Sequence, residues 1–342
     1  PAWQRLIVMA GGVIMNVILA IVLYIAILFS WREQYIRTDD ATYGIEVSPL
    51  AEEIGFRNGD RIIAFDNGPA PESFGDIQID LIRNQVSTVT VLRGNDTVRI
   101  DIDSEYMPAM LNTPGMFGIR LPIMVGGVPD SSLNAGAGMV AGDKFISAAG
   151  RPVMFYQDLQ EVLADNAGTA IDILLLRGTD TISVPVRVGA DGKIGVLLQR
   201  DASGINVTRK DYSLLKAIPA GFVMTFTNIG HYIKELGLIF SPETEAYKSV
   251  GSFISIGSIF PSSWDWQIFW NITALLSIML AVMNLLPIPA LDGGHILFLI
   301  YEMITGRKPS DRFMEIAQMA GMFLLLMIMV LAFGNDIIRL FR

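Results

Sequence analysis

Three long stretches with almost no charge constrain this chain more than any other feature. The first, from Leu6 to Phe29, has no charged residue in 24 positions, and the second, from Trp266 to Tyr301, has one in 36. The third, from Ile316 to Phe333, has none. A helix as long as the first stretch extends roughly 36 Å, which is enough to cross a bilayer with some tilt. The sequence therefore predicts a multi-span α-helical membrane protein.

The second stretch is too long to be one membrane-spanning helix. As a continuous helix it would extend about 54 Å, against a hydrocarbon core of about 30 Å. Proline removes a backbone hydrogen bond from a helix and clashes with the preceding turn, so Pro287 and Pro289 mark the predicted break. The expected membrane segments are a first span within 1–33, a broken segment at 266–301 and a last span at 313–335.

The charged residues concentrate between the first two stretches. Residues 31–267 hold 19 of the 25 Lys and Arg residues and 29 of the 34 Asp and Glu residues, so this block carries a formal charge of −10. A negative block repels the phosphates of nucleic acid, and we expect no nucleic-acid partner. The absence of Cys excludes thiol nucleophiles and Cys-ligated metal sites.

Basic residues near the predicted spans indicate the orientation. Arg5, Arg307, Lys308 and Arg312 fall on one side of a three-span arrangement, and the acidic block falls on the other. Short loops rich in Lys and Arg face the cytoplasm. We therefore expect the acidic block to be extracytoplasmic and the protein to lie in a bacterial inner membrane, in contact with its lipids.

The acidic block contains an internal repeat. Gly59-Asp60 and Gly142-Asp143 each precede a predicted strand, 83 residues apart, and Arg93-Gly94 and Arg177-Gly178 each mark a predicted hairpin, 84 residues apart. A repeat with matched hairpins predicts two copies of one small α+β domain. We place them at 41–106 and 115–200.

The repeated segments resemble PDZ domains of the kind found in bacterial membrane proteases. The resemblance implies that each copy has a groove between a strand edge and a helix, where an extended peptide binds as an added strand. In the alternative interpretation, Gly-Asp only turns the chain into a strand of an unrelated sandwich.

Residues 211–262 are predicted to be a helix at the membrane interface followed by a membrane-associated segment. The uncharged centre of the helical pattern, residues 217–230, has only 14 positions, which is short for a span. We expect residues 249–261 to have β character.

The predicted break carries an isolated carboxylate. Asp292 follows the two prolines and precedes Gly293 in a segment with no other charge. An Asp at the centre of a membrane helix costs about 2.5 to 3.5 kcal/mol on insertion scales, and such residues are functional by default. The structural alternative is that Asp292 caps the restarted helix.

The residues around the break resemble a known protease motif. Asn284, Pro287, Pro289, Asp292 and Gly293 match the pattern Asn-x-x-Pro-x-Pro-x-x-Asp-Gly of the site-2 proteases. The layout, with a tandem PDZ-like insert, is similar to that of site-2 proteases of the bacterial regulator of sigma-E protease type.

The first span adds a weaker match, because Gly12 and Asn16 fit the family's Gly-x-x-x-Asn pattern. The resemblance implies that Asp292 ligates a catalytic Zn²⁺, and that Asn16 and Asn284 hold or polarise the substrate. It also implies regulated intramembrane proteolysis, such as anti-sigma factor processing. In that process transmembrane segments of other proteins are cut and the PDZ-like pair filters the substrates.

One departure from the family pattern concerns the other zinc ligands and the general base. The family takes these from a His-Glu-x-x-His helix, whereas this chain has only His231 and His295. Because the chain begins at Pro1 directly before a span, we expect that helix to lie upstream. A substitute site of His231, His295 and Asp292 would lack a base, and we expect His295 to hydrogen-bond within the helix bundle instead.

Two other function classes remain open at this stage. A catalytically inactive relative would act as a membrane-anchored PDZ scaffold that binds peptides. A transporter would also contain a broken helix, but three spans leave no room for an inverted repeat.

Overall fold

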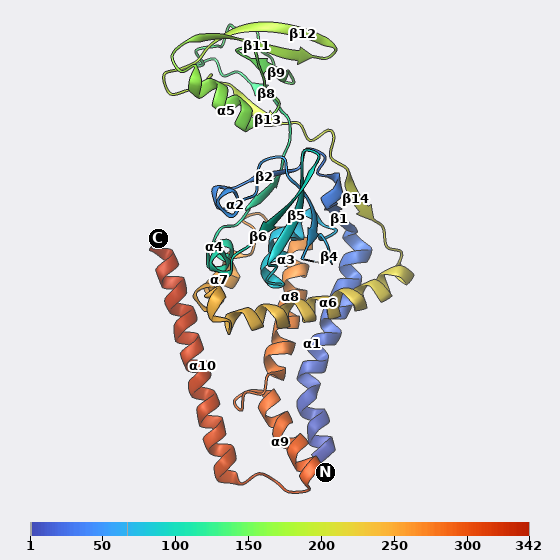
Figure 1. Ribbon diagram of the computed structural model, residues 1–342. Helices are drawn as coiled ribbons and strands as arrows, with labels where there is room; N and C mark the ends of the chain where they lie inside the picture. The colour runs from blue at the N-terminus through green and yellow to red at the C-terminus, as the bar shows by residue number, and fades with distance from the viewer. Residues whose placement is uncertain (1, 67, 342) are drawn as a thin grey trace.

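A computed structural model describes residues 2–66 and 68–341, so Pro1, Asn67 and Arg342 lie outside the described residues. Within them, three helices are long and apolar enough to cross a membrane: α1 (Ala2–Trp31), α8 (Trp266–Leu285) and α10 (Asp311–Leu340). Two β units lie beyond one end of these helices (Figure 1). The predicted combination of membrane helices with a β-containing region is confirmed.

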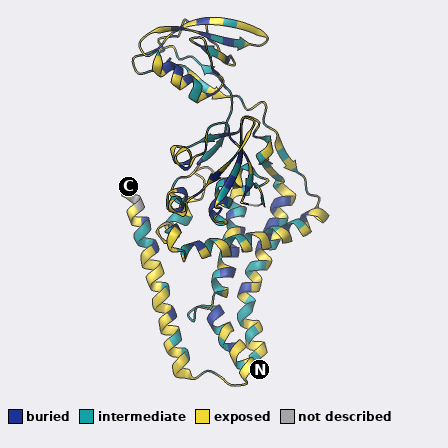
Figure 2. Ribbon diagram, in the orientation of Figure 1, coloured by how far each residue is buried: buried dark blue, intermediate teal, exposed yellow. Residues whose placement is uncertain are grey.

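The spans α1 and α8 pack directly against each other. Ala20 of α1 and Ala274 of α8 are both fully buried, and the small side chains allow the two backbones to approach closely. Tyr24, Ile27 and Ile278 extend this contact. The last span is different, because most of α10 is exposed along its length (Figure 2).

The long second stretch is broken where the prolines predict. The helix α8 ends at Leu285, a non-helical loop follows, and α9 (Asp292–Thr305) restarts the chain. The break thus separates two helices that are each short enough for the membrane.

A short ribbon holds the two ends of the β region together. Strand β1 (Glu33–Ile36) follows α1 and pairs antiparallel with β14 (Val207–Lys210), which precedes the next helix. The chain therefore enters and leaves the β region at the same place.

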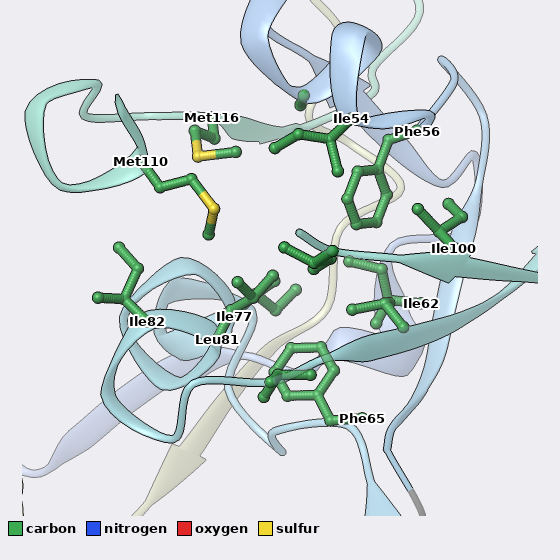
Figure 3. Close-up of a cluster of buried hydrophobic side chains, with 14 of the residues drawn as sticks. Ile54, Phe56, Ile62, Phe65, Ile77, Leu81, Ile82, Ile100, Met110 and Met116 are labelled. Atoms are coloured by element: carbon green, nitrogen blue, oxygen red, sulfur yellow. The ribbon is translucent and has the colours of Figure 1, made fainter. Parts of the chain in front are cut away.

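The first β unit contains a four-stranded sheet in the order β4-β3-β5-β6 and a separate pair of strands, β2 and β7. Its elements are β2 (Ile45–Val47), α2 (Pro49–Ile54), β3 (Arg61–Phe65), β4 (Gly68–Pro69), α3 (Ile77–Arg83), β5 (Thr88–Arg93), β6 (Asp96–Asp101), α4 (Met107–Asn112) and β7 (Phe117–Ile119). Phe56, Leu81 and Met110 are among the side chains that fill its core (Figure 3).

The second β unit has one sheet in the order β12-β11-β9-β8-β13, with β10 paired to β9. Its elements are β8 (Ile123–Gly127), β9 (Lys144–Ala148), β10 (Arg151–Pro152), α5 (Tyr156–Asp165), β11 (Ala170–Arg177), β12 (Asp180–Arg187) and β13 (Leu197–Arg200). Residues 117–119, which the sequence placed with this copy, pair as β7 with β2 of the first unit.

The two repeated motifs meet in space in both units. Arg93 donates two hydrogen bonds of 2.8 Å to the Asp60 carboxylate, and Arg177 donates bonds of 2.8 and 2.7 Å to Asp143. Both carboxylates are almost fully buried. The Gly-Asp turn and the Arg-Gly hairpin of each copy are therefore joined by one bidentate ion pair.

The helix α6 (Leu214–Ile239) lies across α1 below the first β unit (Figure 1). Within the part of the chain that the structure describes, it is not one of the three helices that are long and apolar enough to cross a membrane. Gly221 sits directly on α1, where an added Cβ would come within 3.2 Å of the Ile25 Cα. The first unit is tied to α6 by Arg83, which donates to Glu235 at 2.7 Å.

The segment between α6 and α8 consists of helical turns, so the expected β character is wrong. It contains η4 (Pro242–Thr244), η5 (Ala246–Ser249) and α7 (Phe253–Ser258). Ser252 starts α7 by accepting a hydrogen bond from the Ile254 amide, and Asp336 of α10 accepts from the Ser252 amide at 2.9 Å. These polar contacts favour a capped turn over an extended strand. The remaining short turns are η1 (Thr38–Asp40), η2 (Phe74–Asp76) and η3 (Ser104–Tyr106).

Candidate metal centre

Asp292 is the first residue of α9 and does not cap it. The N-cap is Leu291, whose side chain makes no capping hydrogen bond. Within the described residues, the structure records no hydrogen bond or ion pair to the Asp292 carboxylate. Its Oδ2 lies 3.8 Å from the position that a Cβ on Gly12 would occupy, so the carboxylate faces α1. The helix N-terminus favours a negative charge here.

The proline loop forces the chain into close contact with the start of α9. The Ile288 amide donates to Leu286 O at 2.7 Å, and the Leu291 amide donates to Ile288 O at 2.8 Å. A Cβ added at Gly293 or Gly294 would meet the backbone of the loop at less than 3.0 Å. Two glycines are therefore needed to hold Asp292 at this position.

Asn16 lies one helical turn after Gly12 on α1 and is half-buried. Its backbone oxygen accepts a 2.8 Å hydrogen bond from the Ser277 hydroxyl of α8. Asn284 is also half-buried and lies seven residues beyond Ser277, about 10 Å along α8 towards the break. In the described part of the chain, the structure records no hydrogen bond to either side-chain amide.

The two histidines lie apart from each other. The Gln318 amide of α10 donates to His295 Nε2 at 3.3 Å, so His295 does bond within the bundle. His231 lies on α6, where burial lowers its pKa and the nearby Arg83 cation lowers it further. No group of three His, Asp or Glu residues within 2–66 and 68–341 could hold a metal ion.

A cavity of about 480 Å³ lies beside α9, within about one helical turn of Asp292. It is bounded by the start of α1, by α9 and by the start of α10, and His295 lines it. Arg5 and Glu302 form a 2.8 Å ion pair at its wall. The sequence did not predict this cavity, because its walls come from three separated segments with no shared motif.

The residues present fit a zinc site only in part. A hydrolytic zinc takes three protein ligands and keeps one position for water. Asp292 offers a carboxylate without a recorded partner, which suits one ligand position, and the described residues do not complete the set. We therefore derive no reaction step through a metal.

Comparisons with known proteins agree with the sequence motif. The profile of peptidase family M50, the site-2 protease family, matches residues 1–328. A candidate zinc metalloprotease of Neisseria meningitidis is 28% identical over 98% of this chain and 79% of the relative. One from Ralstonia nicotianae is 25% identical over 100% of this chain and 78% of the relative. One from Mesorhizobium japonicum is 32% identical over 63% of this chain and 61% of the relative.

The family match covers far more than half of the chain and includes the first span, both β units and the proline loop. The chain is therefore a member of peptidase family M50.

Proposed function

We propose that this protein is an intramembrane zinc endopeptidase that cuts transmembrane segments of other membrane proteins. The observation that carries the proposal is the Asp292 carboxylate, which has no recorded partner among the described residues and is held against α1 by the proline loop and the two glycines that follow Asp292. A carboxylate in an apolar segment is costly unless a cation or hydrogen-bond donors compensate it. The zinc metalloprotease names of the relatives support Zn²⁺ as that cation.

The roles of the site residues follow from their chemistry. In this proposal Asp292 supplies one ligand, and the resemblance to the site-2 proteases assigns the other ligands and the base to a His-Glu-x-x-His helix. A bound zinc would polarise a carbonyl and lower the pKa of a coordinated water. A peptide unwound for cleavage in a membrane needs partners for its backbone groups. The Asn16 and Asn284 amides donate to that backbone.

The two β units act in this proposal as PDZ-like domains that filter substrates. A groove of about 560 Å³ lies between α5 and β13, an edge strand of its sheet, and Leu159 and Leu163 line it. In the first unit, a cavity of about 520 Å³ lies beside α3 and α4, and Gln78 at its wall donates to Thr113 O at 2.8 Å and accepts from the Met116 amide at 3.0 Å. Because Gln78 already occupies the Met116 amide directly before β7, we assign the binding of a substrate peptide as an added strand to the second unit.

The orientation is also part of the proposal. The start of α1 and the α9–α10 turn lie at one end of the molecule, and the β units lie at the other (Figure 1). The sequence places Arg5 at the start of α1, and Arg307 and Lys308 in the turn. The positive-inside bias supports a cytoplasmic turn and extracytoplasmic β units in a bacterial inner membrane.

The function is tested by cleavage of membrane-embedded reporter proteins. Asp292→Asn removes the charge while keeping the side-chain size, so it should abolish cleavage in the full-length protein. Asp311→Asn is the matched control, because Asp311 is likewise the first residue of a helix, α10. It should cleave like the parent. If the parent itself cuts no reporter while still binding peptides, the protein is a scaffold and the proposal fails.

A further inference from the structure

Among the described residues, the recorded contacts of the last span with the rest of the protein lie near its end and along its first half. At one end, Asn335 donates to Val250 O at 3.0 Å and Asp336 binds Ser252. At the other end, α10 meets the segment that carries Asp292. The surface of α10 between these areas is largely exposed (Figure 2). The contact of α10 with the segment that carries Asp292, here called the lower contact, is therefore a specific feature of an otherwise loosely packed helix.

The centre of the lower contact is Gly321. A Cβ at this position would lie 2.8 Å from the Ala290 nitrogen and 3.3 Å from Pro289 Cδ. Only glycine lets α10 rest directly on the backbone of the proline loop. The contact point is two residues before Asp292.

A polar contact lies one turn earlier on the same face of α10. Gln318 is three residues before Gly321, and its amide donates to His295 Nε2 at 3.3 Å. His295 follows Asp292 by three residues. The helix α10 thus touches the chain on both sides of Asp292, once through the loop and once through α9.

The loop is held locally by three backbone hydrogen bonds, donated by the amides of Leu286, Ile288 and Leu291, and its non-helical shape needs further support. Its two prolines have no N–H to donate, and non-helical backbone inside a membrane persists only where protein or a water-filled cavity surrounds it. A shift of about 1 Å in a catalytic group can lower a rate about 100-fold.

We propose that α10 is a brace that fixes the position of Asp292, and that Gly321 and Gln318 are positioning residues for the cleavage reaction. The inference rests on the proposed function, because it assigns these residues a role in that reaction. It predicts that α10 stays in contact with the loop during cleavage, in contrast to a gate that moves away to admit substrate.

The first test measures the loop directly and needs no activity. Because the chain has no Cys, Ile288→Cys gives a single thiol in the loop. Gly321→Leu should increase its labelling rate by a water-soluble maleimide about tenfold, since the loop loses its support. Gly334→Leu is the control, because Gly334 lies on the same helix with nothing within 4 Å of its Cβ position. Equal labelling in the two variants would overturn the brace.

The second test measures cleavage in the full-length protein. Gly321→Leu and Gln318→Ala should each lower kcat with little change in KM, because the substrate-binding surfaces are unchanged. Gly321→Ala should lower kcat less than Gly321→Leu. Ala290→Gly should partly rescue Gly321→Ala, since the Ala290 methyl group lies 3.3 Å from the added Cβ position.

A rise in cleavage in Gly321→Leu would show that α10 is a gate and would overturn the proposal. So would unchanged kcat in both Gly321→Leu and Gln318→Ala. If the parent protein cuts no reporter, the proposed function fails separately, and the labelling test still decides whether α10 supports the loop.

Discussion

At the scale of single residues, a buried carboxylate in each β unit binds an arginine from the neighbouring hairpin. Asp143 also accepts a 2.9 Å hydrogen bond from the Val140 amide, which fixes the turn before β9. Asp60 does the same for Arg57 in the first unit, at 2.8 Å. These two carboxylates have the geometry of structural residues, in contrast to Asp292, for which the described residues provide no recorded partner.

The hydrogen bonds from Arg177 are the main cause that lowers the pKa of Asp143. A carboxyl group with a lower pKa in the folded state stabilises the fold above its unfolded pKa, and this contribution is lost as the pH falls through the folded value. Asp143→Asn should therefore destabilise the second unit by about 2 kcal/mol at pH 7 and by less at pH 3. Calorimetry of the full chain in detergent measures this difference.

Asp180→Asn is the control for this prediction, because Asp180 is exposed in the following strand. It should leave the unfolding temperature unchanged. An Asp143→Asn protein whose stability deficit is the same at pH 3 and pH 7 would contradict the role given to the ion pair.

At the scale of elements, the crossing of α6 over α1 connects the β units to the membrane helices. Thr225 of α6 is fully buried there, and its hydroxyl donates to Gly221 O at 2.8 Å. Ile25, at the crossing, is nine residues from Asn16 on the same helix. The position of α6 therefore affects the position of α1, the helix that faces Asp292.

Gly221→Leu should separate α6 from α1, because a side chain at this position collides with the Ile25 backbone. A thiol introduced by Thr225→Cys reports the change, and its labelling rate should rise about tenfold. Gly230→Leu, on the same helix with nothing within 4 Å of its Cβ position, should leave the rate unchanged. Slow labelling in both variants would mean that Gly221 does not set the crossing.

The break between α8 and α9 could be predicted from the sequence, whereas the ion pair in each β unit could not. Pro287 and Pro289 made the break predictable, because proline acts through local geometry. The link between Asp60 and Arg93 was not predictable, since the residues are 33 positions apart and belong to two separately predicted motifs.

The contact between Gly321 of α10 and the proline loop could not be predicted from the sequence either. The helix α10 is apolar on every side over much of its length, so hydrophobic periodicity does not reveal which face packs. The sequence also could not decide whether Asp292 caps α9. The N-cap is the preceding residue, Leu291, and sequence patterns do not place a helix end to within one residue.

At the scale of the whole molecule, the β units and the basic turn lie at opposite ends of the membrane helices (Figure 1). Protease added to intact spheroplasts should digest the β units. Trypsin added to inverted membrane vesicles should cut after Arg307, which is exposed. Digestion of the β units in inverted vesicles alone would reverse the proposed orientation.

The filter is tested by deletion of residues 41–200. The structure allows this cut, because the β1–β14 ribbon that joins the membrane helices lies outside it. The parent protein should cleave a membrane substrate with a trimmed ectodomain and reject one with a bulky folded ectodomain. The deletion should remove that difference. Equal cleavage of both substrates by the parent would leave the β units without a filtering role.

The central claim is that Asp292 ligates the zinc of an intramembrane protease. Its most direct test is the zinc content per chain of purified full-length protein, measured by mass spectrometry for the parent, Asp292→Asn and Asp311→Asn. We predict one zinc in the parent and in Asp311→Asn, and loss of zinc with an unchanged fold in Asp292→Asn. One zinc per chain together with full cleavage in Asp292→Asn would contradict the claim.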